Sequence, residues 1–129
     1  MKRLVSIIII CLFLIGICTF EEILVNTTLD KLHNKSTYMY ELYQKSDSAN
    51  TKELIELTQD LNDYWTKREN ALCFFINHKD MHEMGNEITR LISYSKFNLK
   101  EEFEASLLLI IYYSEEFHHI MGVSVENIF

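Results

Sequence analysis

The feature that most constrains this chain is an apolar segment close to its N-terminus. Residues 4–20 contain no charged side chain, and they are preceded by Lys2 and Arg3 and followed by Glu21 and Glu22. At about 1.5 Å per residue, a helix of this length spans about 26 Å, which is slightly short of a typical hydrocarbon core but within the range of membrane-spanning helices. Basic residues before the segment predict a cytoplasmic N-terminus and an extracytoplasmic C-terminus. We therefore expect a single-pass anchor in the cell membrane.

A cleaved signal peptide is the alternative interpretation of the same residues. Its apolar core would be residues 4–16, with Gly16 and Cys18 as the small residues before a cleavage site. We favour an uncleaved anchor because neither residue forms an Ala-x-Ala pattern. Lipid attachment at Cys18 is disfavoured because the branched Ile17 precedes it. Either way the chain divides into residues 1–20, the anchor or signal peptide, and residues 21–129, an exported domain.

The composition of the exported part favours an all-α fold. The whole chain has no proline and 3 glycines, so it lacks the residues that make tight β-turns and glycine-rich phosphate loops. Lys2 and Arg3 lie outside residues 21–129, so the net charge of -7 becomes about -9 in this part. Such an acidic domain argues against nucleic acid as a partner. Cys73 is its one cysteine, so no intramolecular disulfide is expected.

Spacing of apolar residues predicts an antiparallel bundle of four short helices. The segments are about 23–43, 51–76, a third after Asp80 and a fourth after Asn98. Asn50, Asp80 and Asn98 each precede a glutamate by three residues, as in a capping box, and Gly122 is a candidate C-terminal cap. The predicted core-facing residues are Val25, Leu29, Leu32, Met39 and Tyr43; Leu54, Leu57, Leu61, Trp65, Leu72 and Phe75; Met81, Met84, Ile88, Leu91 and Ile92; and Phe103, Leu107, Ile110, Ser114, Phe117 and Met121.

The boundary near His78 is the least defined by sequence. Three helices with a long, kinked second one are the alternative, because no strong helix breaker lies between residues 51 and 95. We favour a break because the spacing of the apolar stripe changes there: Leu72, Phe75, His78 and Met81 are each three residues apart, unlike the spacing on either side. A continuous helix would also carry charged residues such as Lys79 and Asp80 into the membrane.

Four residues are the candidates for a metal site. His78 and His82 are four residues apart, and Glu115 and His118 form a Glu-x-x-His motif. A di-iron bundle needs two such motifs and two more glutamates, and Asp30 with His33 imitates only part of a second motif. We therefore predict no metal or other cofactor. A metal- or ligand-sensing bundle built on these four residues is the alternative function.

Catalysis is not expected from this sequence. No base accompanies the serines, and the glutamate pairs are typical of solvated helix faces. The aromatic residues Tyr40, Tyr64, Tyr112 and Tyr113 are instead candidates for a protein interface. The apolar tail, residues 127–129, is expected to fold back on the bundle rather than to serve as a hook for a partner.

Several short features resemble a known family. They are the basic start, the apolar segment, Trp65 followed by His78, the stretch 87–91, and the terminal residues 127–129. Together they resemble an uncharacterised bacterial family, a domain of unknown function found in small, single-pass, membrane-anchored helical proteins of low-GC Gram-positive bacteria. The resemblance implies a membrane-anchored helical protein and assigns no functional residue.

The function favoured by the sequence is a non-catalytic interaction module outside the cytoplasm. Residues 4–20 would hold it in the membrane, and a small bundle with exposed aromatic residues would contact an envelope or membrane protein. A second copy of the chain is the other protein partner that the sequence leaves open.

Overall fold

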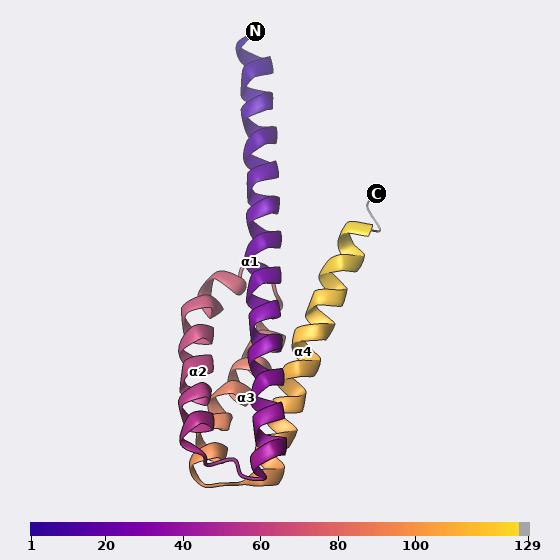
Figure 1. Ribbon diagram of the computed structural model, residues 1–129. Helices are drawn as coiled ribbons and strands as arrows, with labels where there is room; N and C mark the ends of the chain where they lie inside the picture. The colour runs from indigo at the N-terminus through magenta and orange to yellow at the C-terminus, as the bar shows by residue number, and fades with distance from the viewer. Residues whose placement is uncertain (127–129) are drawn as a thin grey trace.

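The computed structural model describes the backbone of residues 1–126 and the side chains of residues 1–117. Over this range it is all-α, as expected, and contains no strand. Successive helices run antiparallel, so the chain folds into a bundle from which the first half of α1 projects (Figure 1). The helices are α1 Lys2–Ser46, α2 Lys52–Leu72, α3 His78–Lys96 and α4 Lys100–Glu126.

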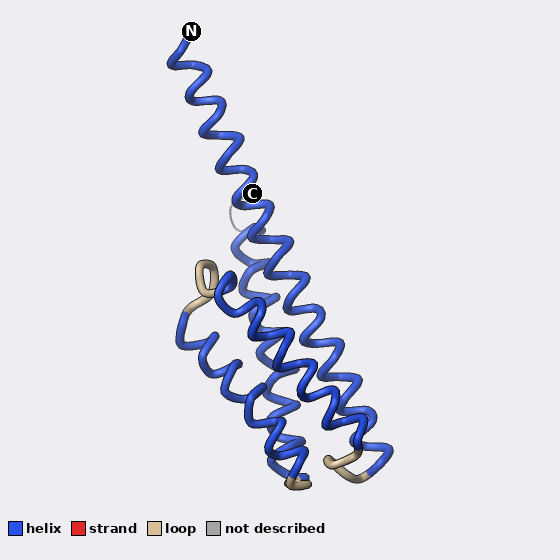
Figure 2. The backbone as a smooth tube through the Cα atoms, turned by 90° about the vertical axis from the view of Figure 1, so that its left-hand side faces the viewer, coloured by secondary structure: helices blue, strands red, loops and turns tan. Residues whose placement is uncertain are grey.

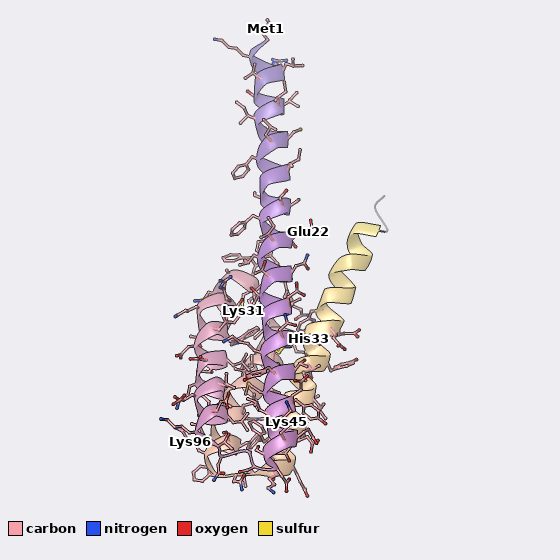
Figure 3. All side chains as sticks on the ribbon, viewed as in Figure 1. Met1, Glu22, Lys31, His33, Lys45 and Lys96 are labelled. Atoms are coloured by element: carbon pink, nitrogen blue, oxygen red, sulfur yellow. The ribbon has the colours of Figure 1, made fainter. Side chains whose placement is uncertain are left out.

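The apolar segment and the first bundle helix form one continuous helix, α1. It contains no proline and only one glycine, Gly16, so nothing in its sequence breaks it. Residues 2–20 are exposed, and Val25 is the first fully buried residue. Figure 3 shows the side chains between Met1 and Glu22 radiating with no other helix beside them. By length and composition α1 is able to cross a membrane.

The core lies between the four helices, and most of its apolar residues are those that the apolar spacing selected; Ala49 is buried in addition. Leu57, Phe75 and Ile92 are half-buried, and the side chain of Met121 lies outside the described residues. Each large apolar side chain contributes roughly 1.5–3 kcal/mol when it is fully buried. The other predicted core residues are all buried: Val25, Leu29, Leu32, Met39, Tyr43, Leu54, Leu61, Trp65, Leu72, Met81, Met84, Ile88, Leu91, Phe103, Leu107, Ile110, Ser114 and Phe117.

The predicted break between the second and third helices is confirmed, and the three-helix alternative is wrong. α2 ends at Leu72 rather than at Ile76, and α3 begins at His78 rather than after Asp80. The side chain of Asn77 accepts a hydrogen bond from the main-chain N–H of Lys79, 2.9 Å away, so Asn77 is the N-cap. Asp80 instead lies in the first turn of α3, where its charge suits the helix dipole.

The other predicted caps also need correction. Thr51 rather than Asn50 caps α2, because its hydroxyl accepts from the Leu54 N–H at 3.2 Å. Asn98 has a left-handed backbone, with φ 51°, and its side chain reaches across to the α1–α2 turn. α4 continues through Gly122 to Glu126, so Gly122 does not end it. The predicted fold-back of residues 127–129 concerns residues outside the described range.

The bundle has two distinct ends. The near end carries the α2–α3 turn, residues 73–77, and it is the end from which α1 projects (Figures 1 and 2). The far end carries the α1–α2 and α3–α4 turns, which contact each other. There the Lys100 ammonium lies 3.3 Å from the Asp47 carboxylate. α1 packs on α2 and α4, and α3 packs on the same two helices.

Candidate functional site

The predicted metal residues lie on different helices of the bundle. His78 and His82 lie in the first two turns of α3, and both are exposed. Glu115 lies on α4, where its carboxylate is 3.7 Å from Nδ1 of His33 on α1. His33 points toward α4 in Figure 3, and the Ser114 hydroxyl lies 3.5 Å from the same nitrogen. The side chain of His118 lies outside the described residues.

These positions do not assemble the predicted ligand set. Within the described residues, no group of three or more His, Cys, Asp or Glu side chains is placed to hold a metal ion. His33 and Glu115 form a pair between α1 and α4. Because the Glu115 carboxylate is exposed to water, this pair contributes little to the stability of the bundle.

A shallow groove runs between α2 and α3. It has a volume of about 220 Å³, and its lining includes Trp65, Glu69, His82 and Gly85. The indole of Trp65 is buried, and its Nε1 atom has no hydrogen-bond partner among the described residues. A Cβ atom built on Gly85 would lie 3.0 Å from this nitrogen, so the missing side chain lets α3 pack closely on the ring.

Two of the predicted interface tyrosines hold the bundle together instead. The Tyr40 hydroxyl donates to the Glu104 carboxylate at 3.2 Å and thereby joins α1 to α4. The Tyr113 hydroxyl donates to the Glu83 carboxylate at 3.4 Å and joins α4 to α3. Burial foremost, and then the neighbouring carboxylate, raises the pKa of both phenols. Both hydroxyls therefore stay protonated at neutral pH and act as donors inside the fold.

The other two tyrosines differ in how far they reach the surface. Tyr64 is half-buried, and its ring packs under Lys31 Nζ at 4.6 Å and Arg68 Cζ at 5.2 Å. Tyr112 is 56% exposed, and its ring lies against that of Tyr113 at a centroid distance of 5.9 Å. Of the four predicted tyrosines, Tyr112 has the geometry of a contact residue.

Tyr112 belongs to an exposed apolar stripe on α4. Leu108 is 46% exposed and Leu109 is 40% exposed, and both lie one helical turn before Tyr112. Ala105 extends the stripe by another turn. We call residues 105, 108, 109 and 112 the α4 stripe. Exposed glutamates lie beyond both ends of it: Glu101 and Glu102 before it, and Glu115 and Glu116 after it.

The sequence contained a signal for this stripe that spacing alone misses. Leu107, Leu108, Leu109, Ile110 and Ile111 are five consecutive apolar residues, so they cover every face of a helix. Leu107 and Ile110 are buried in the core, whereas Leu108 and Leu109 are exposed to solvent. A helix that is apolar all round requires a second apolar neighbour beyond the one that its main stripe contacts.

Comparison with protein families places this chain in a known group. A family model described as a domain of unknown function, DUF4363, matches residues 19–128. The chain belongs to the DUF4363 family. The match begins at the end of the apolar segment, inside α1, and covers the bundle that follows, so most of the apolar segment lies outside the matched region. No curated protein and no solved structure matches the chain.

The DUF4363 assignment agrees with the uncharacterised family that the sequence resembles. The description of the family names no activity, ligand or partner, so it assigns no role to any residue of the bundle. What the domain can do has to be argued from its own surface. Among the side chains of residues 1–117, the α4 stripe and the projecting half of α1 are the main apolar features.

Proposed function

We propose that this DUF4363 protein is a membrane-anchored, non-catalytic interaction module. Residues 4–20 cross the cell membrane with the N-terminus in the cytoplasm, and the bundle stands on the extracytoplasmic side. The exposed apolar side chains of this segment support a membrane span, and the Lys2–Arg3 pair before it supports the orientation. Anchoring confines the bundle to a thin layer beside the membrane, where weak contacts with another membrane protein become effective.

The α4 stripe is the observation that carries the interaction function. Leu108, Leu109 and Tyr112 are large, adjacent and exposed on a helix whose opposite face forms the core. Placing them against a partner removes apolar area from water, and tyrosine is enriched in such contacts. The stripe is small, which suits a weak contact strengthened by the shared membrane.

The charges around the stripe define the partner. In a pair of identical chains, Glu101 and Glu102 would face either their own copies or Glu115 and Glu116, and like charges repel. A different protein that carries an apolar helix face with Lys or Arg at both ends would match. These basic residues would stand about 22 Å apart, because residues 101 and 116 have that separation along a helix. The occupant that we propose is therefore a basic-flanked helix of another membrane or envelope protein.

Three buried serines, Ser95, Ser106 and Ser114, make contacts that suit a structural role. Ser95 donates to the main-chain carbonyl of Ala49, and Ser114 donates to that of Ile111. Ser106 donates to the Glu87 carboxylate at 2.6 Å, and Arg90 binds the other oxygen of this carboxylate at 2.9 Å. These hydroxyls stabilise contacts between and within the helices, which is the part we assign to them.

Photo-crosslinking in living cells tests the proposal. A photoreactive amino acid replaces Leu109 in the full chain, and the matched control replaces Glu56, whose exposed side chain lies on α2. We expect adducts with another protein at position 109 and none at position 56. Mass spectrometry of the adduct should identify an apolar helix flanked by Lys or Arg. Equal yields at both positions, no adduct, a second copy of this chain, or a peptide without those basic residues would overturn the proposal.

A further inference from the structure

The α2–α3 turn at the near end presents a phenylalanine to the outside. Phe74 is 86% exposed, whereas its neighbours Phe75 and Ile76 are half-buried and pack against the core. The main-chain N–H groups of Phe75 and Ile76 both donate to the Leu72 carbonyl at 2.9 Å. The end of α2 therefore holds the turn in place, and Phe74 is directed outward by a fixed backbone rather than by a loose loop.

This turn lies level with the point at which α1 leaves the bundle. α2 has 21 residues and runs antiparallel to α1, so its end lies level with the residue of α1 that is the same number of residues from the far end. Counted back from Ser46, that residue is Asn26. Asn26 is adjacent to Val25, the first buried residue of α1. Figures 1 and 2 both place the turn at the end from which the apolar half of α1 projects. Phe74 is thus on the side of the bundle that faces the membrane if residues 4–20 span it.

The sequence around the α2–α3 turn is locally basic within an acidic domain. The α3–α4 turn at the far end is basic as well, so it is position, not charge, that distinguishes the two turns. Residues 67–79 contain Lys67, Arg68 and Lys79 against the single acid Glu69, a net charge of +2. Residues 21–129 as a whole carry ten basic and nineteen acidic residues, a net charge of -9. Lys67 and Lys79 are exposed. An exposed aromatic side chain with basic residues around it is the pattern of a segment that lies in the headgroup region of a bilayer.

We propose that the α2–α3 turn is a second membrane contact of this protein. Phe74 enters the boundary between headgroups and acyl chains of the bilayer that α1 spans, and the exposed Lys67 and Lys79 approach the lipid phosphates. The inference rests on the proposed anchoring, and it adds a specific consequence. With two points of contact instead of one, the bundle has a fixed height and tilt, and the α4 stripe keeps one orientation relative to the membrane.

Depth-dependent quenching by brominated lipids tests this contact in the full chain. The protein is placed in two sets of phosphatidylcholine and phosphatidylglycerol vesicles. The acyl chains of the first set are brominated near the headgroup, where they report on position 74, and those of the second set are brominated near the bilayer centre, where they report on position 13. Three variants each add one tryptophan: Phe74→Trp at the near end, Phe97→Trp at the far end and Phe13→Trp in the apolar segment. Phe97 is the matched control because it is 74% exposed in the turn at the opposite end. Trp65 is buried and present in every sample, so the parent protein supplies the background.

We expect added quenching for Phe13→Trp and Phe74→Trp, and a signal equal to that of the parent protein for Phe97→Trp. If Phe13→Trp is quenched while Phe74→Trp behaves like Phe97→Trp, the turn does not touch the bilayer and this inference fails alone. If Phe13→Trp itself is not quenched, residues 4–20 are not in lipid. In that case the proposed anchoring fails, and the membrane contact of the turn fails with it.

Discussion

The side chain of Asn98 accepts a hydrogen bond from the main-chain N–H of Ala49, with 2.8 Å between the two atoms. The bond joins the α3–α4 turn to the α1–α2 turn, and Ala49 is fully buried. Ser95 adds a second contact of the same kind, because its hydroxyl donates to the Ala49 carbonyl. Ala49 of the first turn is thus held through its N–H by Asn98 of the second turn and through its carbonyl by Ser95 in the last turn of α3.

Loss of this acceptor should destabilise the bundle. We expect Asn98→Ala to lower the free energy of unfolding by about 1–3 kcal/mol, because the buried Ala49 N–H is left without a partner. Alanine is also strained at the left-handed φ of 51° that Asn98 adopts. Asn98→Asp is the control, since a carboxylate keeps the acceptor. Chemical denaturation followed by circular dichroism measures both, and equal stabilities for Ala and Asp would contradict the role of the acceptor.

A side chain at Gly85 should displace the indole of Trp65. A Cβ atom there lies 3.0 Å from Nε1, and valine adds two methyl groups beyond it. We expect Gly85→Val to shift the fluorescence maximum of Trp65 to longer wavelength and to lower the melting temperature, because the ring moves toward water. Trp65 is the only tryptophan, so the emission reports this site alone. Gly16→Val is the control, because nothing lies within 4 Å of the Cβ position of Gly16, and it should leave the emission unchanged.

Alkaline pH should weaken the fold through its buried phenols. Burial foremost, and then the charges of Glu104 and Asp47, raises the pKa of Tyr43 above its ordinary value of 10.0. Burial and Glu83 do the same for Tyr113. The folded state therefore keeps these protons at a pH at which the unfolded chain has lost them. The stability from this effect is complete below pH 10.0 and declines as the pH rises through the pKa values of the folded state.

Thermal denaturation between pH 8 and pH 11 measures this decline. We expect the melting temperature to fall above about pH 10, and to fall less steeply in a Tyr43→Phe, Tyr113→Phe double variant. An equally steep decline in the double variant would show that other groups are responsible.

Metal analysis decides the alternative function. We expect substoichiometric zinc and iron in protein purified without a histidine tag, because two of the candidate ligands lie at different places. His82 borders the α2–α3 groove, whereas Glu115 pairs with His33 between α1 and α4. One metal ion per chain, lost in a His78→Ala, His118→Ala double variant, would instead establish the sensing bundle.

The fold was predictable from sequence because its determinants are local and periodic. The 3–4 spacing of apolar residues identified the core faces, and the change of step near His78 identified the α2–α3 turn. Helix ends were less predictable. Asn50 and Asn98 have the side chains of caps, but Thr51 takes the capping position of α2, and Asn98 bonds to Ala49, which is 49 residues away in sequence. Such a contact exists only after the helices have packed.

The candidate surface was only partly predictable for a similar reason. Tyr40, Tyr112 and Tyr113 are the same residue type on neighbouring helices, and only their partners separate them. Glu104 accepts from the Tyr40 hydroxyl, and Glu83 accepts from the Tyr113 hydroxyl. Each carboxylate lies on a different helix from its tyrosine, so residue spacing within one helix does not reveal the contact. The exposure of Phe74 likewise depends on how the α2–α3 turn packs, since Phe75 beside it is half-buried.

The central claim is that residues 4–20 span the membrane and leave the bundle outside the cytoplasm, because the partner and the second membrane contact both depend on it. Labelling of intact cells with a membrane-impermeant maleimide tests the claim directly, in a chain whose native cysteines are replaced by alanine. We predict labelling of a Glu56→Cys variant, whose position on α2 is exposed, and protection of a Lys2→Cys variant until the membrane is permeabilised. Protection of both positions, or labelling of both in intact cells, would contradict the account.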